Sequence, residues 1–258
     1  MPNLFSTLLS LAGTTPGALR HETGVLVADV AGRTALRRTA AAVVALVVLL
    51  VAAHCALAGL SRVGIDWAGT LWDTRLFNLG ADRMLPEWVE YGLLALGAAA
   101  LLRAFAAGRA AIHLVLVLIL LAMAADNALS LHEAAGRALM GEVDQFRGEA
   151  LLILGVAALL GALVLAALRL SPAADRPGAV LVIAAIGLVL PFGVAVDFLH
   201  TLIQPLGFDW LLEAMVVVED GGELAVIALV AVLSFAVGRR AAERADGMTF
   251  VRGLQPGE

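Results

Sequence analysis

The residues of this chain that could do chemistry are histidines and carboxylates placed inside or beside apolar segments. Three groups of polar residues recur at helical spacing: Asp126, Ser130 and Glu133; Asp197 and His200; Glu219 and Glu223. Because residues three or four positions apart lie on the same face of an α-helix, each group predicts a polar stripe along one helix.

Imidazole and carboxylate together are the ligands of many zinc, non-haem iron and manganese sites, so the stripes indicate a divalent metal. The predicted metal ligands are Asp126, His132, Glu133, Asp197, His200, Glu219 and Glu223. Secondary candidates are His54, Ser130, Glu149 and Asp220. A second interpretation stays open, because clustered carboxylates repel one another until a proton or a cation neutralises them. No residue is assigned a catalytic role.

The lengths of the apolar segments decide how deep these groups lie. Leu224–Val237 has 14 residues, fewer than the roughly 20 that a helix needs to cross a bilayer. Glu219 and Glu223 are therefore predicted to lie within the membrane, where a break at Gly221-Gly222 would resemble the interrupted helices of transporter ion sites. The alternative is a helix that enters the membrane after these acids. Since a charge facing lipid costs several kcal/mol, we expect the stripes to converge on one outward-facing cavity.

The elements that position these residues are transmembrane helices. Hydrophobic residues make up 61% of the 258 residues and charged residues 15%, against roughly 45–50% and 25% in soluble domains. The predicted spans are Thr39–Leu60, Trp88–Ala107, Ala110–Leu131, Glu149–Leu170, Ala179–Ile203 and Trp210–Val237. The sequence therefore predicts an all-α fold, a polytopic membrane bundle of about six transmembrane helices.

The distribution of arginine predicts the orientation. With the N-terminus in the cytoplasm, 12 of the 17 basic residues, all of them arginines, fall on cytoplasmic segments, as the positive-inside rule requires. We expect an N-in, C-in protein of a cell inner membrane. The predicted organisation is a cytoplasmic segment 1–38 that could include an interfacial helix, a transmembrane domain 39–237 and a cytoplasmic tail 238–258.

Charge and cysteine content exclude one class of partner and one class of fold. The net charge of −5 and the absence of a Lys/Arg cluster exclude a nucleic-acid partner, and the single Cys55 excludes a disulfide framework. Membrane lipids are the expected partners, and an oligomer or a partner within a membrane complex stays open. Neither G-x-S-x-G nor H-E-x-x-H occurs in the chain.

Two resemblances rest on short motifs. Asp126–Glu133 and Glu219–Glu223 resemble the acidic residue followed by His-Glu, and the later E-x-x-x-E, of bacterial multi-pass inner-membrane proteins without an assigned activity. The scattered Ser, Asp and three His loosely resemble the ceramidase-like intramembrane hydrolases, whose zinc is held by three His with an Asp and a Ser nearby. That family has H-x-x-x-H on a late helix, where this chain has Glu219-x-x-x-Glu223.

Three functions are compatible with these observations. The leading hypothesis is an outward-facing site for zinc, iron or manganese that acts on a lipid-borne substrate, as an intramembrane hydrolase or oxidoreductase. The second is a proton- or cation-coupled carrier or channel component that uses the same carboxylates. The third is a structural subunit of a membrane complex.

Overall fold

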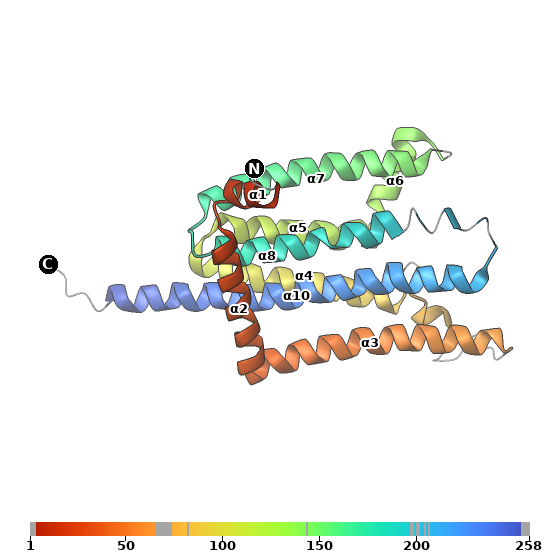
Figure 1. Cartoon of the computed structure of the whole chain (residues 1–258), viewed down its shortest axis with the longest axis horizontal. Coiled ribbons are helices and arrows are strands. Elements are labelled where there is room, and N and C mark those ends of the chain that lie inside the picture. Colours follow the sequence, from red (N-terminus) through yellow and green to blue (C-terminus); the bar gives the residue numbers. More distant parts are fainter. Residues whose placement is uncertain are drawn as a thin grey trace. The chain divides into compact units, whose positions relative to one another are not determined.

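The computed structural model describes residues 4–64, 74–81, 83–142, 144–196, 199, 202–203, 205 and 207–253, and within these ranges it is helical without strands. The elements are α1 (Leu4–Leu11), α2 (Pro16–Gly32), α3 (Thr34–Arg62), η1 (Thr74–Phe77), α4 (Leu85–Gly108), α5 (Ala111–Leu129), α6 (Leu131–Met140), α7 (Gln145–Leu170), α8 (Arg176–Gly187), the short π-helical η2 (Pro191–Val196) and α10 (Asp209–Gly253) (Figure 1). The prediction of an all-α fold is confirmed.

Five helices in the described part of the chain are long and apolar enough to cross a membrane. They are Thr34–Arg62, Leu85–Gly108, Ala111–Leu129, Arg147–Leu170 and Asp209–Ala245. The predicted span Ala179–Ile203 corresponds to α8, which is apolar but has only 12 residues and is followed by η2. The chain is thus a helical membrane protein.

The helices form two compact units. Unit 1 comprises Met1–Asp29, Leu94–Ile183 and Leu233–Glu258, and unit 2 comprises Val30–Leu93 and Ala184–Val232. Helices α4, α8 and α10 each contribute one part to each unit. Within unit 1 the buried side chains include Leu101, Ile112, Leu116, Leu168 and Val237. Within unit 2 they include Leu50, Leu57, Leu79, Leu224 and Ile227.

Small residues let α4 and α10 approach closely within unit 1. A Cβ at Gly238 would lie 2.6 Å from the carbonyl oxygen of Ala100, and one at Gly97 would lie 3.4 Å from Cβ of Ser234. Helices in a membrane associate through such close packing, because lipid tails provide no hydrophobic drive between them.

Polar side chains complete several helix ends. The Ala18 N–H donates to Oγ1 of Thr15, just before Pro16 opens α2, so a Thr N-cap is followed by proline at the first helical position. The Ile112 N–H donates to Oγ of Ser171, 59 residues away, over 3.0 Å. Ser171 thereby satisfies an amide of the α5 N-terminus that has no partner inside its own helix.

Two predicted helix boundaries are wrong. The expected break at Gly221-Gly222 does not occur, because α10 runs without interruption from Asp209 to Gly253. Backbone groups in an apolar environment must be satisfied within the helix, and Gly221 packs against Val51 and Leu79 there. In the other direction, the span predicted to continue to Leu131 ends at Leu129, since Ser130 adopts the left-handed conformation with φ 48°.

Candidate functional site

His54 lies in unit 2, near the end of the apolar helix α3, and is 5% exposed. Its Nδ1 accepts a hydrogen bond from the Leu79 N–H over 3.2 Å. Its Nε2 lies 3.0 Å from Oε1 of Glu213 on α10. The ring thus connects α3, the segment that follows η1 and the beginning of α10.

These contacts assign the proton of the ring. The Leu79 N–H donates to Nδ1, which therefore keeps its lone pair, so the hydrogen of the neutral imidazole is on Nε2. Nε2 lies 3.0 Å from Oε1 of Glu213, but the two atoms do not form a hydrogen bond of good geometry. In this tautomer His54 has no free lone pair for a metal ion, because Nδ1 accepts from Leu79 and Nε2 carries the hydrogen.

The Glu213 carboxylate lies between a buried and an exposed partner. Oε2 of Glu213 lies 3.8 Å from Nη2 of Arg62, in the last turn of α3, and the same guanidinium donates to the Asp209 carbonyl over 3.4 Å. The Glu213 side chain is 36% exposed against 5% for His54. It therefore connects the buried ring to the surface of unit 2.

The segment Asn78–Gly80 joins His54 to the acidic turn of α10. Gly80 lies so close to α10 that an added Cβ would be 3.2 Å from Oδ2 of Asp220. The Gly80 N–H in turn donates to Oδ1 of Asn78, which fixes the turn. We define the His54 site as His54, Glu213, Asp220 and the Asn78–Gly80 turn between them.

The continuity of α10 keeps its carboxylates on regular helical positions. Glu219 and Glu223 are half-buried, four residues apart, and therefore on one face of α10. Between them, Gly222 leaves room for the Phe192 ring of η2, with which a Cβ at this position would collide. Asp197 and His200, the other predicted ligands of this region, lie outside the described residues.

Asp126 and His132 pair in unit 1, but as a helix-terminal arrangement. Oδ1 of Asp126 accepts the His132 N–H over 2.9 Å, and Oδ2 lies 3.0 Å from Nδ1 of the same residue. The predicted continuous stripe Asp126, Ser130, Glu133 is wrong, because the left-handed Ser130 separates α5 from α6.

Glu133 and Glu149 are joined by a polar chain between α6 and α7. Arg137 donates to Oε2 of Glu133 and to Oε1 of Gln145, each over 3.4 Å, and Gln145 donates to Oε1 of Glu149 over 2.5 Å. The helices cross at Gly136 and Gly148, where a Cβ would meet the facing backbone. The two carboxylates therefore have structural partners within unit 1.

The structure thus divides the predicted ligand set between the units. Asp126, His132, Glu133 and Glu149 belong to unit 1, whereas His54, Glu219, Asp220 and Glu223 belong to unit 2. Over the described residues, no three His, Cys, Asp or Glu side chains are grouped as a metal site would require. The metal remains a prediction, because two of its proposed ligands are not described.

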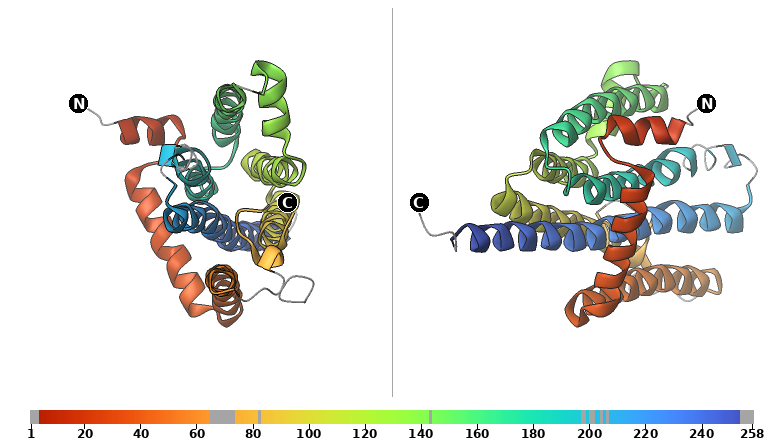
Figure 2. Two further views of the ribbon diagram at one scale, coloured as in Figure 1. Left: turned by 90° about the vertical axis from the view of Figure 1, so that its right-hand side faces the viewer. Right: turned by 60° about the vertical axis from the view of Figure 1, so that its left-hand side comes forward.

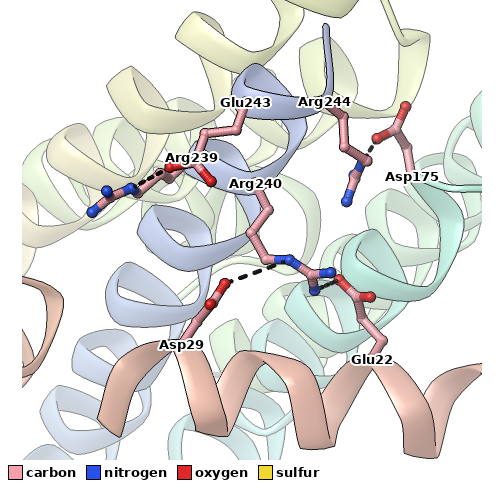
Figure 3. A network of polar contacts seen from close by, with 7 residues as sticks. All are labelled: Glu22, Asp29, Asp175, Arg239, Arg240, Glu243 and Arg244. Carbon is pink, nitrogen blue, oxygen red and sulfur yellow. Dashed lines mark hydrogen bonds and ion pairs between the residues drawn. The ribbon is translucent and has the colours of Figure 1, made fainter. Parts of the chain in front are cut away.

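Sequence analysis missed a second polar cluster, in unit 1 (Figure 3). Nη1 of Arg240 lies 2.6 Å from Oε1 of Glu22, and its Nε lies 3.6 Å from Oδ2 of Asp29. Nη2 of Arg244 lies 2.6 Å from Oδ1 of Asp175. One sequence feature could have predicted this cluster. Glu22 and Asp29 are two turns apart on one helix, in a chain whose basic residues are all arginines.

His113 was also missed. It is 1% exposed in α5, and neither ring nitrogen has a hydrogen-bond partner among the described residues. No pattern in the sequence distinguishes it from a histidine at a helix end, since only two residues separate it from the predicted start of its span.

Comparison with known families gives one match. The model of the family described as Domain of unknown function (DUF8692) matches residues 40–237, which contain the His54 site and the Asp126–His132 pair. No curated protein and no solved structure matches the chain.

Proposed function

We propose, for a chain that belongs to the Domain of unknown function (DUF8692) family, a proton-coupled function in the membrane. In this proposal the protein is a carrier or a channel component, and His54 and Glu213 take up and release the proton. The observation that carries it is the contact of a buried histidine with a carboxylate inside apolar helices. Ionisable residues in such positions are costly, and they mark proton relays in many pumps and transporters.

The geometry couples the proton to the backbone. Full protonation of His54 would place a hydrogen on Nδ1, opposite the Leu79 N–H that now donates to it. Two donors cannot share this contact, so either the proton goes to Glu213 or the Asn78–Gly80 turn moves away. Because Gly80 packs against Asp220, a movement of the turn would reach the acidic turn of α10.

Proton binding tests this proposal without knowledge of the transported substrate. The purified protein, reconstituted in liposomes, is stepped between about pH 8 and pH 5, the range over which imidazole titrates. Dye absorbance measures proton uptake, and infrared difference spectra report the carboxylates. We expect His54→Gln and Glu213→Gln each to take up fewer protons than the wild type, because each substitution removes one member of the pair.

The matched control is Glu142→Gln, an acid exposed in the turn after α6, which should keep the uptake of the wild type. His54→Gln should alter the infrared bands of the carboxylates, although Glu213 is still present in that variant. If the wild type, Glu213→Gln and His54→Gln take up the same number of protons, the proposal is wrong and the structural-subunit hypothesis takes precedence.

A divalent-metal site is the second candidate, favoured by the Asp126–His132 pair. With Nδ1 beside the carboxylate, Nε2 would be the ring nitrogen left to bind a metal, and carboxylates orient metal-binding histidines in this way. Element analysis of the purified protein tests it. Stoichiometric zinc, iron or manganese that is lost in His132→Ala supports the site, and protein without bound metal contradicts it.

We also propose six spans, with α8 and η2 as the fifth, and an N-in, C-in orientation in the inner membrane. The support is the arginine distribution together with five long apolar helices and the shorter α8. Reporters fused after Arg109, Asp144, Ser171 and the last residue should be inside, outside, inside and inside. A C-terminal reporter that is active only outside would contradict the orientation.

A further inference from the structure

Helix α6 lies across α5 and α7 within unit 1. Figure 2, left, looks along α5 and α7, and α6 appears from the side (Figure 2). The change of direction begins at Ser130, whose φ of 48° ends α5, and finishes at Gly141, with φ 77°. If α5 and α7 cross the membrane, α6 runs roughly parallel to its surface.

Helix α6 exposes large apolar side chains, whereas a helix surrounded by water would expose mainly polar ones. Leu131, Leu139 and Met140 are 48%, 60% and 45% exposed, and Ala138, directly before Leu139, is exposed as well. The side that faces the protein carries Gly136, which is buried against α7. We define the α6 apolar face as Leu131, Ala134, Ala138 and Leu139, which fall within about 140° of the helix circumference at roughly 100° per residue.

The polar residues of α6 already have partners in the protein. His132 pairs with Asp126, and Glu133 with Arg137, which also reaches Gln145. The α6 apolar face therefore contains no group that needs water. Exposed apolar surface of this kind marks contact with another apolar phase.

The neighbouring surfaces identify that phase. Leu129 on α5, and Leu151 and Leu154 on α7, are 62%, 56% and 67% exposed on helices that are apolar enough to cross a membrane. Helix α6 joins these two helices in the chain and begins two residues after Leu129. Because α6 carries only one arginine, attraction to anionic headgroups contributes little.

We propose that α6 is an interfacial membrane helix, whose α6 apolar face inserts among lipid acyl chains at the end of the α5–α7 hairpin. Helices with such a face lie in the bilayer surface with the apolar side buried roughly 5–10 Å below the headgroups. Its partner is thus the bilayer itself, and the Asp126–His132 pair lies behind a helix that is covered by lipid.

Spin labelling of the full-length protein tests the inference. The single cysteine, Cys55, is exposed and is replaced by serine. Nitroxide labels are then attached to Leu131→Cys and Leu139→Cys, with Leu154→Cys on α7 and Glu142→Cys in the following turn as references. The protein is reconstituted in vesicles of phosphatidylcholine and phosphatidylglycerol, and collision rates with oxygen and with a water-soluble nickel chelate are measured.

Oxygen concentrates in acyl chains and the chelate in water. We expect the ratio of oxygen to nickel collisions at positions 131 and 139 to be closer to that at 154 than to that at 142. Ratios closer to that at 142 would overturn the inference. Low collision rates with both reagents, together with dipolar broadening between labels, would also overturn it, because a second copy of the chain would then cover the face.

Discussion

His54 shows how a single backbone contact decides the chemistry of a side chain. The Leu79 N–H holds Nδ1 as an acceptor, so the hydrogen of the neutral ring is on Nε2, which lies 3.0 Å from Oε1 of Glu213. A histidine in the same apolar helix without this contact could ligate a metal through either nitrogen. The proton-coupled proposal therefore depends on the Asn78–Gly80 turn as much as on His54 itself.

We predict that His54→Ala lowers the free energy of unfolding by about 1–3 kcal/mol, because it leaves the buried Leu79 amide without an acceptor. Unfolding by titration with sodium dodecyl sulfate, followed by circular dichroism, measures the change. His21→Ala is the matched control, since His21 is exposed on α2 and its loss should cost less than about 0.5 kcal/mol. Equal losses in both variants would mean that the His54 contacts do not stabilise the fold.

At the scale of the element, α10 is the helix that sequence reasoning described least well. Its two adjacent glycines and three nearby acids resemble a break, but the structure uses these glycines for packing. Gly222 receives the Phe192 ring and Gly238 receives the Ala100 carbonyl. Glycine in a membrane helix can therefore mark a close approach of two helices rather than an interruption.

We predict that Gly238→Ala lowers the free energy of unfolding by about 1–3 kcal/mol, since its Cβ would overlap the Ala100 backbone and force α4 and α10 apart. Gly247→Ala, on the same helix with no atom within 4 Å of the added Cβ, is the control. It should instead stabilise α10 by about 0.5–1 kcal/mol, because alanine loses less backbone entropy than glycine. Detergent unfolding compares the two, and a destabilised Gly247→Ala would contradict this account.

At the scale of the whole molecule, residues from distant parts of the chain meet through charge. Glu22 and Arg240 are 218 positions apart in the sequence, and their contact holds α2 against the C-terminal half of α10 within unit 1 (Figure 3). Arg176 contributes a further contact, donating to the Gly13 carbonyl over 3.4 Å. The N-terminal helices are thus part of a folded unit.

We predict that Arg240→Met releases α2, because Glu22 and Asp29 lose their shared cation while an unbranched apolar side chain still covers the helix surface. Trypsin should then cleave after the exposed Arg20 about tenfold faster, which corresponds to about 1.4 kcal/mol. Arg239→Met is the control, since Arg239 pairs only with Glu243, on the same helix, among the described ion pairs. Its cleavage rate should stay within twofold of the wild type, and equal acceleration in both variants would contradict the role of Arg240.

Composition and periodicity alone were sufficient to predict the fold class of this protein. An apolar segment of about 20 residues has few alternatives to a membrane helix, so the bounds of α3, α4, α5 and α7 were predicted to within five residues. Helix α10 runs to Gly253, well beyond the predicted end at Val237. Angular arithmetic worked only where a helix continued, as between Glu219 and Glu223. It failed between Asp126 and Glu133, since nothing in the type of Ser130 requires a left-handed backbone.

Only the tertiary structure decided which polar groups meet. Glu213 lies within the predicted span Trp210–Val237, but its contact with His54 depends on how two helices far apart in the sequence are packed. The same holds for Glu22 with Arg240. Helical period specifies which residues share a face, a property local to each helix. The pairing of faces depends on the close packing of many side chains at once, and no short stretch of sequence encodes that.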